Sequence, residues 1–160
     1  MQDISTGRLD TFYDYLDSVV DAYDGLRIAV LAQIDAVGRA DIPAMNENLR
    51  RQQALISRIA DFELKVDMHF AQLDVQADTL TEFISQIPKE QQYRFYDVLG
   101  RFAAVAQDVA IYKEQCRALL EAKIYAVEKY LKKQGKIPGT TYGKNAIQIE
   151  EHSHMLKTDV

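Results

Sequence analysis

Apolar side chains recur every three or four residues through the first quarter of the chain, and this spacing constrains the fold more than any other feature. From Leu9 to Val37 the steps between apolar residues are 3, 4, 3, 4, 3, 4, 4 and 3. That spacing keeps one apolar stripe on one face of an α-helix, as a bundle or coiled-coil seam requires. We therefore predict a long helix over residues 10–37, and we expect Gly38 to end it.

A second helix is predicted to begin at Asp41-Ile42-Pro43 and to reach Leu73. Asp41 or Ile42 would cap this helix, and a proline in the first turn loses no hydrogen bond. Because the connection after Gly38 is very short, the first two helices should form an antiparallel hairpin.

A short helix and a second long one are predicted next. Asp78 is a candidate cap for the short helix, and Pro88 should begin the long helix, which reaches about Gln134. Gly100 is a candidate bend in it. The expected apolar stripe of this last helix comprises Tyr96, Leu99, Phe102, Ala106, Val109, Cys116, Leu120, Ile124, Val127 and Leu131.

The distribution of charge predicts which helices are neighbours. Residues 1–37 carry a net charge of −5 and residues 88–134 a net charge of +3. Opposite signs favour placing the first and last long helices side by side.

These patterns predict an all-α fold, an elongated antiparallel helical bundle or coiled-coil hairpin with three long helices and one short helix. With three prolines and seven glycines in 160 residues, a few long elements are favoured over many short strands. We assign residues 1–134 to the bundle domain. Residues 135–160 form a C-terminal tail that either binds a client, packs back on the bundle or is disordered.

Charge and composition exclude several classes of function. A net charge of −5 disfavours binding to nucleic acid or to an anionic membrane surface. The sequence holds no run of about 18 apolar residues and no signal peptide, so we expect a cytoplasmic protein without membrane insertion. Cys116, the single cysteine, cannot form an internal disulfide.

The chemistry of the side chains argues against an enzyme. Glu151-His152-Ser153-His154 holds one Glu-x-x-His spacing, whereas a di-iron bundle needs two such motifs and two further glutamates. His69 is interpreted as a helix-surface or seam-edge histidine, and Cys116 as a buried small hydrophobe. No glycine-rich phosphate loop is present. We therefore predict no catalytic residue, no metal site and no cofactor.

Two stretches resemble FlgN-type flagellar export chaperones. The first is AVGRADIPAMNENLRRQQALISRIADFE at 36–63, in which Gly38, Asp41, Gln53, Leu55 and Ile56 match the family's first hairpin. The second is RALLEAKIYAVEKYLKKQ at 117–134, followed by Thr-Tyr-Gly at 141–143, which resembles the family's C-terminal region.

The resemblance implies a cytoplasmic holding chaperone without catalysis. Members of the family bind hook–filament junction (hook-associated) proteins, prevent their premature assembly and deliver them to the flagellar type III export apparatus. The family's client contact lies in the C-terminal region. Carried onto this sequence, it implicates seven client-binding residues: Leu120, Ile124, Val127, Leu131, Ile137, Tyr142 and Ile147.

Two other functions stay open. The chain could be a self-assembling coiled-coil scaffold, because its stripe is wide enough to support a homodimer. It could also be another type III secretion chaperone with a different client.

Overall fold

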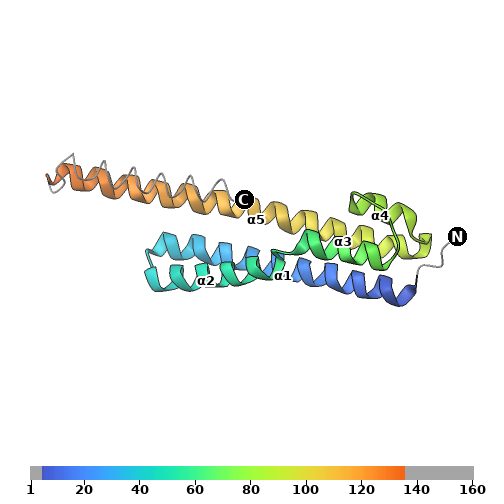
Figure 1. Cartoon of the computed structure of the whole chain (residues 1–160). Helices are drawn as coiled ribbons and strands as arrows, with labels where there is room; N and C mark the ends of the chain where they lie inside the picture. Colours follow the sequence, from blue (N-terminus) through green and yellow to red (C-terminus); the bar gives the residue numbers. More distant parts are fainter. Residues whose placement is uncertain (1–4, 136–160) are drawn as a thin grey trace. The chain divides into compact units, whose positions relative to one another are not determined.

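The computed structural model describes residues 5–135, which form five α-helices and no strand (Figure 1). The prediction of an all-α helical bundle is confirmed. In chain order the helices are α1 (Thr6–Arg39), α2 (Ile42–Ile59), α3 (Phe62–Gln72), α4 (Leu80–Gln86) and α5 (Lys89–Lys133).

The chain divides into two compact units, Met1–Leu119 and Leu120–Val160. The first unit holds α1 to α4 and the first part of α5, and α5 continues without interruption into the second. The predicted boundary between bundle and tail, after residue 134, lies at the edge of the described residues and stays a prediction.

A tight turn joins α1 to α2 close to the position that the sequence-based prediction gave it. α1 runs one residue past Gly38, and Ala40 takes the left-handed conformation (φ 54°) that ends it. The Ala40 and Asp41 N–H groups donate to the carbonyls of Val37 and Ala36, as in a Schellman motif. The Asp41 carboxylate then accepts from the Ala44 N–H at 3.1 Å, which confirms Asp41 as the cap of α2.

The structure divides the second predicted helix at Ala60–Asp61 into α2 and α3. Neither proline nor glycine causes this break. Immediately after it, the Phe62 ring stacks on Phe102 of α5, with centroids 5.9 Å apart and planes 8° from parallel. The break therefore coincides with the point where the chain places an aromatic ring against α5.

α4 is capped by Thr79 and not by Asp78, which corrects the sequence-based prediction. The Thr79 hydroxyl accepts from the Glu82 N–H at 3.1 Å, while the Glu82 carboxylate accepts from the Asp78 N–H at 2.8 Å. This reciprocal pair is a variant of the capping box, and it satisfies two N–H groups at the start of a helix of seven residues.

Four phenylalanines fill the core of the first unit where α1, α3, α4 and α5 meet. We call Phe12, Phe70, Phe83 and Phe95 the phenylalanine cluster; each is at most 6% exposed. Their rings meet edge to face, stacked or, for Phe12 and Phe95, tilted, at centroid distances of 5.1 to 5.8 Å. Such pairs stabilise the fold by about 0.5–1.5 kcal/mol each beyond the apolar area they bury.

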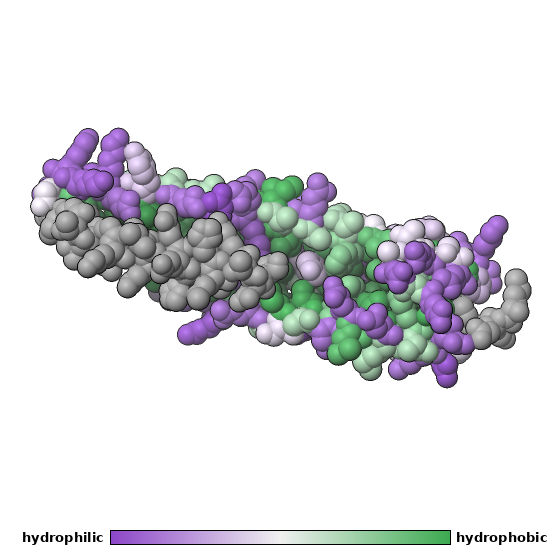
Figure 2. Space-filling model, turned by 45° about the horizontal axis from the view of Figure 1, so that its top comes forward, coloured by the Kyte–Doolittle hydropathy of each residue, from purple (hydrophilic) through white to green (hydrophobic). Residues whose placement is uncertain are grey.

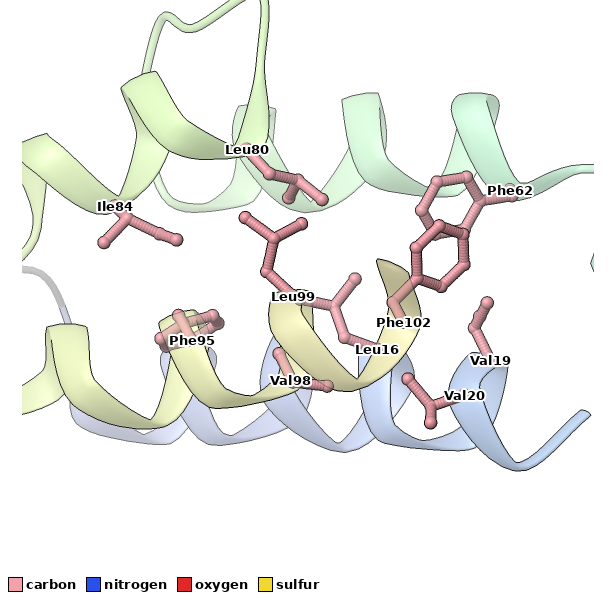
Figure 3. Close-up of a pocket in the computed structure, with 10 residues that line it drawn as sticks. All are labelled: Leu16, Val19, Val20, Phe62, Leu80, Ile84, Phe95, Val98, Leu99 and Phe102. Atoms are coloured by element: carbon pink, nitrogen blue, oxygen red, sulfur yellow. The ribbon is translucent and has the colours of Figure 1, made fainter. Parts of the chain in front are cut away.

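A small void lies beside this cluster (Figure 3). Its volume of about 20 Å³ is close to that of a single water site, but ten apolar side chains line it. Phe62 and Phe102 close one end, and Leu80 of α4 faces Leu99 of α5. Because water would find no hydrogen-bond partner there, we interpret it as a dry packing defect and not as a ligand site.

α1 and α5 lie side by side in the first unit, as their opposite charges predicted. Arg94 reaches Asp10 at 2.7 Å, and Arg101 reaches Asp17 at 2.9 Å. All four side chains of these ion pairs are at least partly exposed, so the pairs select the neighbouring helix more than they stabilise it.

Packing changes along α1 toward the hairpin turn. Here Leu26 and Val30 meet Val109 of α5 in a second, smaller cluster. Two polar residues, Gln33 and Asn48, are buried at 6% and 7% exposure, and the Gln33 Oε1 atom has no hydrogen-bond partner. The core at this end is therefore smaller and more polar than the phenylalanine cluster.

Hydrophobic side chains also reach the surface, and Figure 2 shows such residues in green among charged ones in purple. None of the helices in the described part of the chain combines the length and the apolar character needed to cross a membrane.

Candidate helix-docking face

The apolar stripe of α5 begins in the core and continues beyond it. From Phe95 the steps of three and four residues pass through Leu99, Phe102 and Val109 and reach Leu131 without a change of face. The structure starts this stripe at Phe95, which is 1% exposed, whereas the predicted Tyr96 is 50% exposed. The sequence-based choice of Tyr96 was therefore wrong by one residue.

Buried side chains occur only in the first half of α5. Its buried residues are Phe95, Val98, Val105 and Val109, and no described residue after Val109 is buried. An apolar stripe of this kind needs a partner because leaving it in water forfeits roughly 25 cal/mol for each Å² of apolar surface.

Four of the predicted client-binding residues form the exposed part of the stripe. Leu120, Ile124 and Val127 are 39%, 48% and 55% exposed, and Leu131 is partly exposed. Their spacing of four, three and four residues places them on one face, which we call the distal face. The other three predicted residues, Ile137, Tyr142 and Ile147, lie outside the described residues, so their role stays a prediction.

Lysines surround the distal face. Leu120–Lys133 holds four lysines and two glutamates, a net charge of +2 in a chain whose total charge is −5. A net positive charge of this kind attracts an acidic segment and raises the rate of encounter more than the final affinity. The distal face therefore favours a partner with an apolar stripe and acidic flanks.

Two tyrosines beside this face were missed by the sequence-based prediction. Tyr125 and Tyr130 are 66% and 62% exposed. They do not continue the steps of three and four residues, so a search along the stripe passes over them. Their signal in the sequence is the high number of tyrosines, nine in 160 residues, since exposed tyrosines are common in binding surfaces.

The histidine and the cysteine of the described chain show no catalytic arrangement. His69 stacks on the rings of Phe12 and Tyr15, at centroid distances of 4.9 and 5.3 Å. Burial, with a smaller effect of Lys65, lowers the pKa of His69. The Cys116 side chain is only partly buried, which corrects the prediction of a buried residue, and this partial burial raises the pKa of its thiol and disfavours the reactive thiolate.

Within residues 5–135, no group of three or more histidine, cysteine, aspartate or glutamate side chains could hold a metal ion. His152 and His154, the histidines of the predicted weak metal motif, lie outside these residues.

Comparison with protein-family models, with curated proteins and with solved structures gives no match to this chain.

Proposed function

We propose that the chain is a holding chaperone that binds an amphipathic helix of a client protein on the distal face of α5. One observation carries this proposal: the stripe that α3 and α4 cover at Phe95 and Phe102 continues as exposed apolar residues from Leu120 onward. Amphipathic helices bind by laying their apolar faces on surfaces of this kind, with anchors spaced by three, four and seven residues.

The finer identity of the client rests on the resemblance to FlgN-type chaperones. We propose that the clients are hook–filament junction proteins, bound through their terminal helical segments in the cytoplasm and passed to the flagellar export apparatus. The four lysines around the distal face support a client helix with acidic flanks. No catalytic step belongs to this function.

Co-expression tests the proposal. The full chain is produced with terminal helical fragments of the hook–filament junction proteins of the same genome, and the purified species is measured by light scattering. We expect a discrete complex that contains one chaperone and one fragment. A fragment whose apolar anchors are changed to serine provides the matched control, and it should not co-purify.

The alternative functions predict other results. If none of these fragments co-purifies and the chain alone forms a homo-oligomer of fixed size, the chain is a self-assembling scaffold and the proposal fails. If a helical client of another secretion system binds in their place, the holding function stands and the flagellar assignment fails.

A further inference from the structure

A second recess lies within the first unit, between α1 and α2. Its α1 wall consists of Gly25, Ile28, Ala29 and Ala32, and its α2 wall of Arg51, Ala54, Leu55 and Arg58. We call these eight residues the α1–α2 groove. Its volume of about 430 Å³ lies in the range of sites that hold a small ligand or several side chains, about 300–1,000 Å³.

The floor of the groove consists of small residues, so little side-chain volume lies above the helix backbones there. At Gly25 the helices approach so closely that a Cβ atom would lie 3.3 Å from a methyl group of Leu55. Ala29, Ala32 and Ala54 extend no side chain beyond Cβ. Ile28 stands at the edge with 52% of its surface exposed, so the groove offers apolar surface to a partner.

The two charged residues that line the groove are both arginines on α2. Arg51 and Arg58 are seven residues apart, which separates their Cα atoms by about 10 Å along the helix. Arg51 meets Glu47 only at 3.7 Å, and both side chains are more than half exposed. Arg58 makes no ion pair with another residue of the described part of the chain. Both guanidinium groups can therefore receive a partner's carboxylate.

Two aspartates elsewhere on α1 do not cancel this charge. Asp24 is paired with Arg27 at 2.8 Å, and Asp35 is paired with Arg39 at 2.9 Å. Neither aspartate lines the groove. The groove thus combines an apolar floor with a positive edge on one side.

We infer that the α1–α2 groove binds a second helical partner, an amphipathic helix with two large apolar side chains one turn apart and two carboxylates seven residues apart. Laid along the groove, such a helix would place its apolar side chains over the alanines. Its carboxylates would meet Arg51 and Arg58, and arginine favours such pairing because its planar guanidinium matches a carboxylate. This inference concerns a surface separate from the distal face and does not rest on the chaperone proposal.

Two synthetic helical peptides of about five turns test the inference with the full-length, ¹⁵N-labelled protein. Both carry the same apolar residues. One has glutamates seven residues apart beside them, and its twin has lysines at those positions. We expect the glutamate peptide to shift the amide resonances of Ala29, Ala32 and Ala54, and the lysine twin to bind at least about tenfold more weakly.

Charge reversal on α2 supplies the matched variants. Arg51→Glu with Arg58→Glu should weaken binding of the glutamate peptide about tenfold or more and favour the lysine twin. The matched pair is Arg51→Glu alone and Arg50→Glu, which makes the same single change of charge on the same helix outside the groove and should keep most of the affinity. A groove-filling variant, Ala54→Leu, should weaken both peptides without changing the charge.

Three outcomes would overturn the inference. The first is equal binding of both peptides to the unchanged protein. The second is unchanged affinity of the glutamate peptide for the double arginine variant. The third is a set of shifted resonances confined to the distal face, which would support helix binding there while removing the groove as a site.

Discussion

The two halves of α5 carry the same kind of apolar stripe, yet only one of them is covered. Around Phe95 the stripe lies against α1 and α4, and Phe95 itself is 1% exposed. Around Ile124 the stripe has the same spacing, and Ile124 is 48% exposed. The difference teaches that amphipathic spacing determines which face of a helix is apolar. Whether that face is buried depends on whether another helix of the same chain packs against it.

The largest expected effect is on the covered half. Phe95→Ala removes a ring that contacts Phe12, Tyr13 and Phe83, and we expect it to lower the free energy of unfolding by about 3–5 kcal/mol. Tyr96→Ala on the adjacent, half-exposed position should cost much less, about 0.5 kcal/mol. Urea unfolding followed by circular dichroism measures both. Equal costs would mean that the stripe starts at Tyr96, as the sequence suggested.

A stabilising change is expected at the hairpin end. Gln33→Leu replaces a buried amide, whose Oε1 atom has no hydrogen-bond partner, with an apolar side chain of similar size. We expect the free energy of unfolding to rise by about 1–2 kcal/mol because an unpaired buried polar group is removed. Leu26→Ala, in the smaller cluster with Val30 and Val109, is the control in the opposite direction and should lower the free energy of unfolding. A loss of stability in Gln33→Leu would show that this amide has a partner.

A smaller effect should appear with pH in the covered half. Burial lowers the pKa of His69 in the folded protein below its ordinary value of 6.5. As the pH falls through about 6.5, the unfolded chain takes up the proton first, so the folded state loses stability between that pH and the lowered pKa. His69→Phe keeps a ring on Phe12 and should flatten the dependence of the unfolding midpoint on pH between about 7.5 and 5.5. An unchanged slope would assign the effect to other groups.

The smallest effect on stability is expected on the uncovered half. Ile124→Ser should change the free energy of unfolding of the chain by no more than about 0.5 kcal/mol, because Ile124 is 48% exposed and lies outside both buried clusters. Thermal unfolding without any client provides the measurement. A loss comparable to that of Phe95→Ala would show that the distal face is covered within the molecule, and the comparison between the two halves would fail.

The sequence was sufficient to predict the helices because their signals are local. Steps of three and four residues predicted α1 and α5, and Asp41 and Pro88 marked helix starts. The same local reasoning could not find the break at Ala60–Asp61, since no proline or glycine marks it and the Phe62–Phe102 contact joins residues 40 positions apart. Phe95 and Tyr96 are adjacent aromatic residues that both fit the spacing to Leu99, so the packed structure is needed to tell which one begins the buried stripe.

The same limit of local sequence patterns applies to the candidate sites. The four residues of the distal face could be named from the sequence because an exposed stripe has the same spacing as a buried one, and their client-binding role stays a prediction. The α1–α2 groove was not predicted. Gly25, Ala29 and Ala54 are unremarkable in sequence, and their role depends on two helices approaching each other closely.

The most direct test of the central claim is the affinity of a client helix for variants of the distal face. The protein would be titrated calorimetrically with the fragment that co-purifies best. Ile124→Asp with Val127→Asp places carboxylates in the apolar stripe, and Ala122→Asp places one at an exposed position on the opposite side of the helix. We expect the double variant to lose at least about a hundredfold in affinity, equivalent to about 2.7 kcal/mol, and the Ala122 variant to bind nearly as well as the unchanged protein. Unchanged binding by the double variant would contradict the claim that clients dock on this face.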